Sequence, residues 1–205
     1  MKKKQFDSDI FILNDKYLRL TDILDLGPQT VTELDLGCGS GDMAHGLAAL
    51  YPERVILAAD VMLGRLRKVA RGARRRNITN LRLLRVEARH LCSVILPDQS
   101  LDRVHILCPD PWPKHRHKGN RLMSSDFMAH LHRILKPGGV LHFSTDDVPY
   151  LEYTTKNIRN SGLFMESDSS PIADIAHITT EFERQWLAAG KKVFHSAWLP
   201  ACNPK

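Results

Sequence analysis

Alternating strand-like and helix-like segments predict an α/β fold with a mostly parallel central sheet and an antiparallel strand near the C-terminus. Short apolar runs recur between stretches whose apolar residues repeat every three or four positions. This alternation is typical of a parallel sheet with helices on both faces. Successive runs end in a carboxylate or a glycine turn, and ligands of such folds bind where the carboxyl ends of the strands meet. We therefore expect a ligand site at that edge.

Each expected strand is a short apolar run, and each expected helix has one apolar face or a clear stop signal. The expected strands cover residues 31–36, 55–59, 81–86, 101–108, 140–144 and 193–198, with a further candidate at Phe164. The expected helices cover residues 17–24, 42–50, 62–73, 127–135 and 150–161. Lys136-Pro137-Gly138-Gly139 ends the fourth helix, because neither proline nor glycine continues a helix well. Residues 168–177 are expected to form a loop.

The bulk composition is that of a globular domain with a slight preference for anionic partners. The 205 residues are 43% hydrophobic and 25% charged, with a formal charge of +6. No apolar run is long enough to span a bilayer, and the lysine-rich start is not followed by the apolar core of a signal peptide. Four scattered cysteines lack the spacing of a zinc site or a disulfide framework. We expect a cytoplasmic protein without a metal site.

The segment Asp35-Leu36-Gly37-Cys38-Gly39-Ser40-Gly41 predicts a cofactor-binding turn after the first buried strand. Glycines let the backbone approach a ligand closely, although dinucleotide enzymes share such turns. Asp35 would repel a pyrophosphate but attract the ammonium of a methionine moiety, which favours S-adenosylmethionine. Asp60, after the next strand, is placed for ribose hydroxyls, and Glu87-Ala88 for the adenine amine. The structural alternatives are an ordinary tight turn for the glycines and a helix N-cap for Asp60.

The segment Pro109-Asp110-Pro111-Trp112-Pro113-Lys114-His115-Arg116-His117 predicts a rigid turn after a strand. Proline fixes φ and has no N–H, so these prolines neither continue the strand nor start a regular helix. A carboxylate beside a flat ring suits a planar, hydrogen-bonding ligand, and the cations suit phosphate. That combination suggests a nucleobase in a nucleic acid. Trp112 could instead pack on the core, and Lys114 could be a solvated surface charge.

These motifs together resemble the tRNA (guanine-N7)-methyltransferase family over residues 33–198. The PDPWPKHRH segment and Thr180-Glu181-Phe182-Glu183 are specific to that family, whereas DLGCGSG and the Leu-Lys-Pro-Gly-Gly stretch occur throughout class I methyltransferases. The resemblance implies a single Rossmann-like class I methyltransferase domain. Its parts would be an N-terminal extension (1–30), a cofactor-binding core (31–150) and a substrate-side part (151–205). It further implies S-adenosylmethionine as cofactor, tRNA as partner and methyl transfer to N7 of a guanine, in a monomer or homodimer.

Individual residues receive expected roles from their positions and from this resemblance. Guanine N7 is an unprotonated lone pair, so methyl transfer needs in-line positioning rather than a base. The resemblance implies that Asp110 is the catalytic residue, close to both cofactor and base. Thr180 with Glu183 also fits a capping box that merely begins a helix. The expected cofactor-binding residues are Asp35, Gly37, Gly39, Gly41, Asp60, Glu87, Ala88 and Asp110. The expected substrate-binding residues are Lys114, Arg116, His117, Arg121, Asp146, Thr180 and Glu183.

Alternatives follow from a departure at the end of the proline-rich segment. Where the family continues RHxKRR, this chain has RHKGNR, so Gly119 and Asn120 replace two cations. One alternative is therefore the same fold and cofactor with N-methylation of a small nitrogen heterocycle. Two alternatives do not depend on this departure. They are methylation of an exocyclic amine, by analogy with the Asp-Pro-Pro-aromatic loops of amino-methyltransferases, and an RNA-binding protein on a degenerate methyltransferase fold. The arginine-rich stretch from Arg65 to Arg76 could form an RNA track or only a solvated helix face.

Overall fold

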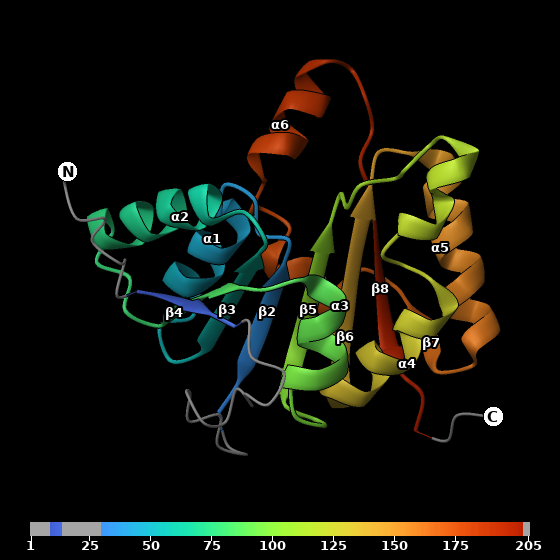
Figure 1. Ribbon diagram of the computed structural model, residues 1–205, viewed down its shortest axis with the longest axis horizontal. Helices are drawn as coiled ribbons and strands as arrows, with labels where there is room; N and C mark the ends of the chain where they lie inside the picture. Colours follow the sequence, from blue (N-terminus) through green and yellow to red (C-terminus); the bar gives the residue numbers. More distant parts are fainter. Residues whose placement is uncertain (1–8, 14–29, 203–205) are drawn as a thin grey trace.

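The computed structural model describes residues 9–13 and 30–202, and within these residues the core is an eight-stranded sheet (Figure 1). The strand order is β1-β4-β3-β2-β5-β6-β8-β7. Strands β1 to β6 pair in parallel, and β8 runs antiparallel to β6 and β7. The strands are β1 (Ile10–Ile12), β2 (Thr32–Leu36), β3 (Val55–Asp60), β4 (Leu81–Arg85), β5 (Leu101–Leu107), β6 (Leu135–Thr145), β7 (Phe164–Ser167) and β8 (Phe194–Pro200).

Helices cover both faces of the sheet, and alternate strand residues supply the two apolar layers. The helical segments are α1 (Asp42–Leu50), α2 (Leu63–Arg75), α3 (Ala88–His90), the π-helical η2 (Leu91–Ile95), the 3₁₀ segments η3 (His115–Asn120) and η4 (Ser170–Ile175), α4 (Ser125–Ile134), α5 (Val148–Ser161) and α6 (Glu181–Ala188). Buried residues of α1, α2 and η4 form one core cluster, and those of η2, α4 and α5 form the other. Figure 1 shows α6 projecting beyond the end of the sheet.

The predicted α/β class, with a mostly parallel sheet and an antiparallel C-terminal strand, is confirmed. Helix α1 has the predicted bounds, and the other predicted strands and helices occur with shifts of one or a few residues. The helix expected at residues 17–24 lies outside the described residues. Among the described helices, none is both long and apolar enough to cross a bilayer.

Several segments differ from the sequence-based expectation. Helix α4 ends at Ile134, and β6 begins at once and runs through the Lys-Pro-Gly-Gly stretch, with a register shift against β5. Gly138 has a φ of +77°, which lets this irregular stretch enter the strand. Residues 168–177 are not all loop, because Ile172 and Ile175 are buried in a 3₁₀ turn against the sheet. Strand β1 and the α3–η2 segment had not been expected, whereas α6 corresponds to the capping-box alternative for Thr180 and Glu183.

Candidate active site

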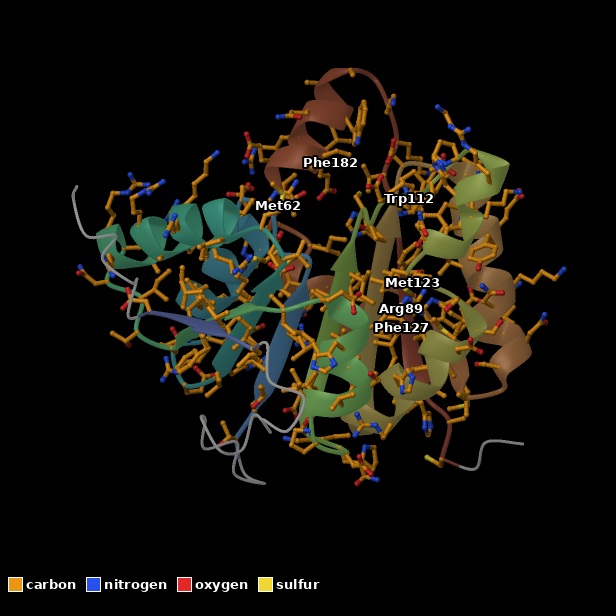
Figure 2. The ribbon with its side chains drawn as sticks, viewed as in Figure 1. Met62, Arg89, Trp112, Met123, Phe127 and Phe182 are labelled. Carbon is orange, nitrogen blue, oxygen red and sulfur yellow. The ribbon has the colours of Figure 1, made fainter. Side chains whose placement is uncertain are left out.

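A cavity of about 710 Å³ opens at the carboxyl ends of β2, β5 and β6, where the strand order reverses direction. We call one side the glycine wall; it consists of Leu36, Gly37, Gly39, Ser40, Arg65, Lys68 and Ala88. We call the other side the proline wall; it consists of Leu107, Cys108, Pro109, Asp110, Pro111, Trp112, Asn120, Leu122, Asp146, Glu181, Phe182 and Gln185. Figure 2 shows Met62, Trp112 and Phe182 at this end of the molecule.

The glycine turn has two residues that face the cavity and one that serves helix packing. Gly37, Gly39 and Gly41 have φ values of +83°, +54° and +83°. A Cβ on Gly37 would meet nothing within 4 Å, and one on Gly39 would meet only the Gly37 carbonyl oxygen at 3.9 Å. A Cβ on Gly41 would lie 2.7 Å from Val69 Cγ2. Gly37 and Gly39 thus leave open space for a ligand, whereas Gly41 lets α1 approach α2.

Replacing Gly41 with alanine is expected to destabilise the protein by roughly 3 kcal/mol, from the left-handed backbone and the clash with Val69. Chemical denaturation would measure the loss. Gly37→Ala is the matched control, because it carries the same backbone strain without the clash and should cost less stability. Equal losses in the two variants would contradict this assignment of Gly41.

Asp35 is a buried carboxylate whose electrostatics suit a cationic ligand. Its Oδ2 has no hydrogen-bond partner among the described residues. Burial raises the pKa of Asp35 to about 7, and the negative charges of Asp60 and Asp42 add to the rise. A hydrogen bond from the backbone N–H of Ala44 lowers this pKa but does not offset the effect of burial. Asp35 directly precedes Leu36 and Gly37 of the glycine wall. A ligand ammonium close to this carboxylate would favour its ionised form.

Asp60 does not line the cavity, and its carboxylate is occupied by the protein itself. Oδ2 accepts from the Gly39 N–H at 3.2 Å and lies 3.3 Å from Arg65, while Oδ1 accepts from the Met62 N–H at 2.7 Å. Asp60 therefore ties the glycine turn to the beginning of α2. Its Met62 contact resembles the capping alternative, although Met62 rather than Asp60 occupies the N-cap position.

Glu87 and Ala88, expected together near adenine, separate in the structure. Glu87 is exposed and caps α3, because its Oε2 accepts from the His90 N–H at 2.8 Å. Ala88 lines the cavity. The strand end therefore reaches the site through Ala88, while the carboxylate beside it stabilises the helix start.

The proline-rich turn is held in a strained conformation. Cys108 and Trp112 have φ values of +46° and +44°, a region that bulky residues rarely occupy. The Cys108 N–H donates to the Ser144 carbonyl at 2.9 Å, and Arg121 Nε donates to the Pro111 carbonyl at 2.8 Å. These contacts fix the turn on both sides of Asp110, which is exposed and lines the cavity.

Trp112 lines the cavity rather than packing in the core. It is half-buried, and its ring meets that of His117 edge-on with centroids 5.7 Å apart. The reading of Trp112 as a core residue is therefore wrong. Lys114 and Arg116 are exposed and do not line the cavity, whereas Asn120, in the altered family motif, does.

Arg121 was expected to contact the substrate, and the structure gives it a different role. It is only 5% exposed, and its guanidinium lies over the rings of Tyr150 and Tyr153, at 5.1 and 4.7 Å from their centroids. Together with the bond to Pro111, these contacts fasten the turn to α5. The expected substrate contact is corrected to an anchoring role.

Helix α6 brings one residue to the cavity that sequence reasoning missed, Gln185, whereas Glu181 and Phe182 belong to the stretch 180–183 that the family resemblance places at the substrate site. Glu181, Phe182 and Gln185 line the proline wall. Thr180 and Glu183 do not. Thr180 caps the helix, its Oγ1 accepting from the Glu183 N–H at 3.1 Å, but the Glu183 carboxylate is bonded to His195 at 3.0 Å. Only half of the capping box therefore forms. The Thr-x-x-Glu spacing was the available signal for this helix.

The end of β6 adds Asp146 to the cavity, as expected. Its side chain is partly buried, and Lys191 Nζ lies 3.8 Å from Asp146 Oδ2. Burial raises the pKa of the nearby Cys108 thiol to about 11, and the charges of Asp146 and Glu183 add to the rise. A hydrogen bond with Ser144 lowers this pKa by less. Glu183 thus lies close enough to the proline wall for its charge to act there.

Comparison with known proteins agrees with this architecture. Residues 29–196 match a protein family described as a putative methyltransferase. The chain is 36% identical over 162 residues to the tRNA (guanine-N(7)-)-methyltransferase of Syntrophotalea carbinolica, covering 78% of this chain and 70% of that protein. It is 33% identical over 175 residues to the Caulobacter vibrioides protein of the same name, covering 83% and 77%.

Solved structures show the same fold at low sequence identity. The 16S rRNA methyltransferase KamB matches with a TM-score of 0.62 at 16% identity, over 90% of this chain and 95% of that one. A SAM-dependent methyltransferase from Aquifex aeolicus matches with a TM-score of 0.58 at 14% identity, over 89% of both chains. The structures support the class I methyltransferase fold, and the sequence relatives are more specific. The chain belongs to the tRNA (guanine-N7)-methyltransferase family.

Proposed function

We propose that the protein transfers a methyl group from S-adenosylmethionine to N7 of a guanine in tRNA. The observation that carries this proposal is one cavity with two chemically different walls. A glycine turn next to a buried carboxylate with one unpartnered oxygen forms one side, and a strained turn presenting Asp110 forms the other. The named function of the sequence relatives supports the same reaction.

The glycine wall fits the proposed cofactor. The open space over Gly37 and Gly39 leaves room for the close approach of a ligand. Asp35 would hold the ammonium group, which would relieve the cost of its own burial. Ala88 would border the adenine, and Asp60 would act indirectly by fixing Gly39. When bound, S-adenosylmethionine supplies a methyl group activated by its sulfonium.

The proline wall fits the edge of guanine that carries hydrogen-bond donors. Asp110 and Asp146 are acceptors placed on this wall, and guanine offers N1–H and an amino group. Trp112 and Phe182 add flat apolar surface for the purine ring. Because N7 carries no proton, these residues have only to hold the base in line and exclude water. Asp110 would then lie close to both ligands, the position that the family resemblance implies.

Cations around the opening fit the phosphates of tRNA. Lys68 and Arg65 line the cavity itself, and Lys114, Arg116 and Lys118 are exposed beyond the proline-rich turn. The relatives give no support to the small-heterocycle alternative. We also propose a cytoplasmic location, supported by the tRNA substrate and four free cysteines, and a monomeric or homodimeric state.

Incubation with labelled S-adenosylmethionine and unmodified tRNA, followed by nucleoside analysis, tests the proposed function. We expect 7-methylguanosine, at a rate that falls steeply with salt because phosphate contacts release counterions. Isothermal titration calorimetry with S-adenosylmethionine alone establishes that the protein is folded and binds the cofactor. Methyl found on an exocyclic amine, or no 7-methylguanosine from protein that binds the cofactor, would contradict the proposal.

A further inference from the structure

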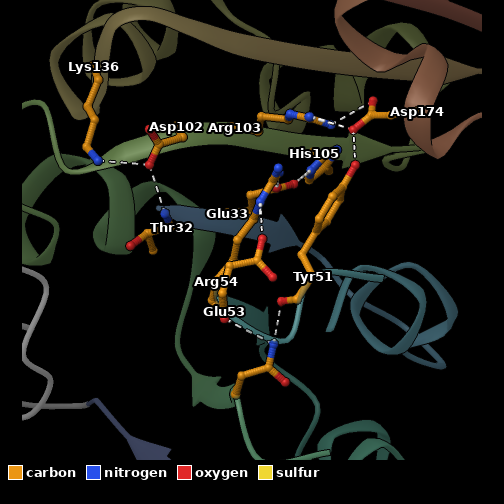
Figure 3. Close-up of polar contacts among 11 residues, drawn as sticks. Thr32, Glu33, Tyr51, Glu53, Arg54, Asp102, Arg103, His105, Lys136 and Asp174 are labelled. Atoms are coloured by element: carbon orange, nitrogen blue, oxygen red, sulfur yellow. Dashed lines mark hydrogen bonds and ion pairs between the residues drawn. The ribbon is translucent and has the colours of Figure 1, made fainter. Parts of the chain in front are cut away.

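A continuous row of hydrogen bonds crosses the sheet from a buried glutamate to α6. Glu33 Oε2 lies 3.0 Å from His105 Nε2, and His105 Nδ1 lies 3.1 Å from His142 Nδ1. His142 Nε2 lies 2.9 Å from His195 Nδ1, and His195 Nε2 lies 3.0 Å from Glu183 Oε1. We call these five residues the histidine relay. Figure 3 shows its inner end, where Glu33 lies between Arg54 and His105.

Strand register explains why these side chains meet. His105 on β5 is directly opposite His142 on β6, and His195 on β8 is opposite Ser144, two residues further along β6. All lie on the face that carries the core cluster of α1, α2 and η4. Glu33, His105 and His142 are almost completely buried. The relay therefore connects the centre of the sheet to the helix that borders the cavity.

The relay needs one proton more than its neutral imidazoles supply. Four contacts join three imidazoles and two carboxylates, and each contact requires one proton to be a hydrogen bond. Three neutral imidazoles bring three protons, and ionised carboxylates bring none. Without a fourth proton, two acceptor atoms would face each other at about hydrogen-bonding distance. The extra proton must make one imidazole an imidazolium or one carboxylate neutral.

The surroundings favour an imidazolium at one end of the row. Burial would raise the pKa of Glu33, but the hydrogen bond and charge of His105, together with Arg103 and Arg54, hold it below its usual value. Burial, together with His105, His195 and Arg103, lowers the pKa of His142 well below its usual value. The extra proton is therefore best placed on His105 or His195, each of which lies beside a carboxylate.

We propose that the histidine relay holds one excess proton that keeps His195 donating to Glu183, and so fastens α6 where its residues border the bound guanine. The part played by guanine rests on the proposed function. With the proton present, the Glu183 carboxylate is fixed to β8, and Glu181, Phe182 and Gln185 keep their places on the proline wall. When the relay loses that proton, an acceptor pair forms within the row. The relay can place that pair at its outer end, between His195 and Glu183, so this contact weakens. Glu183 and the histidines are positioning residues.

Other charged and titratable groups also face the relay. At its inner end and centre these are Asp35, Tyr51, Arg54, Arg103 and Asp174, and at its outer end Cys108, Asp146 and Lys191. Any pH profile contains their contributions. The decisive comparison is therefore between variants that change the proton count of the relay and a variant that changes a carboxylate elsewhere.

Glu33→Gln is the sharpest test, because it changes the proton count with almost no change in shape. Its amide oxygen can accept from Arg54 while its NH₂ donates to His105, so neutral histidines then satisfy all four contacts. In the wild type, KM for tRNA should rise about tenfold as rising pH removes the extra proton from the relay, with kcat little changed. In Glu33→Gln this rise should disappear. A rise merely displaced along the pH axis, or unchanged, would overturn the proposal.

A second relay variant keeps the proposal testable if Glu33→Gln fails to fold, and a control variant changes a carboxylate outside the relay. His105→Phe also removes the need for the extra proton, because only the His142–His195 and His195–Glu183 contacts remain and neutral His142 and His195 supply one proton to each. It should flatten the same profile. Asp102→Asn is the matched control, because Asp102 lies on β5 outside the relay and bonds the Thr32 N–H and Lys136. It should keep the wild-type rise. Loss of the rise in Asp102→Asn as well would overturn the assignment to the relay.

Ring-nitrogen NMR of the free protein separates this proposal from the proposed function. At pH 7 the wild type should show one imidazolium, or one proton shared between imidazoles, among His105, His142 and His195. Glu33→Gln should show three neutral rings. Three neutral rings in the wild type would overturn the relay even if tRNA is methylated. The expected NMR pattern in a protein that does not methylate tRNA would overturn only the proposed function.

Discussion

Replacing Asp35 with asparagine is expected to stabilise the free protein at pH 8 while removing its affinity for S-adenosylmethionine. Asp35 has a folded-state pKa of about 7, against 3.8 as its usual value. The folded state therefore binds a proton that the unfolded state has released, and stability is lost as pH rises from about 4 to 7. The asparagine variant does not carry this cost, so we expect a gain of roughly 2 to 4 kcal/mol at pH 8. Denaturant unfolding at pH 4.5 and pH 8 measures it.

Asp60→Asn is the matched control and should have the opposite effect on stability. Its carboxylate accepts from the Gly39 and Met62 N–H groups and pairs with Arg65, so an amide would lose contacts at pH 8. Calorimetry with S-adenosylmethionine completes the comparison. An Asp35→Asn protein that still binds the cofactor tightly, or that is less stable than wild type at pH 8, would refute this role.

Replacing Asp110 with asparagine is expected to lower kcat/KM for tRNA methylation by about a hundredfold or more, because an oriented acceptor at the reacting base is lost. Stability should hardly change. The side chain is exposed, and Ser144 and Arg121 hold the turn through backbone groups. Steady-state kinetics together with thermal unfolding separate the two effects.

Asp126→Asn is a suitable control for Asp110, since Asp126 is also exposed and lies in the first turn of α4. Its kinetics should match the wild type. Cofactor affinity should remain near wild type in Asp110→Asn if the carboxylate acts mainly on the base. Activity within tenfold of wild type in Asp110→Asn would remove Asp110 from the catalytic role.

The sequence was most informative where local chemistry decides local structure. Apolar runs predicted the strands, and the glycine and proline-rich turns predicted the two walls, because φ preferences act within a few residues. Helix α6 was indicated only by the Thr-x-x-Glu spacing, because none of its residues is buried and it adds nothing to the apolar core. Strand β1 was not predicted because it is only three residues long and its pairing partner, β4, lies far along the chain.

The roles of single side chains depended on contacts between distant segments. Gly37 and Gly41 look equivalent in the sequence, and only Val69 on α2 distinguishes them. Arg121 belongs to a cationic run, but Tyr150 and Tyr153 give it an anchoring role. The histidine relay joins residues from position 33 to position 195, and it becomes visible only when the strand register is known.

The order of the strands has a consequence for how this site could be redesigned. The glycine wall comes entirely from residues 36–88, and the proline wall entirely from residues 107–185. The two sets belong to successive halves of the chain that meet at the switch between β2 and β5. Under the proposed function, most contacts with the methyl donor come from the first stretch and most contacts with the base from the second, and Asp110 borders both ligands. Exchange of the residues around Asp110 in the 107–122 loop, together with 181–185, should therefore change the methyl acceptor while the glycine wall and Asp110 are kept, which makes the acceptor half a replaceable module.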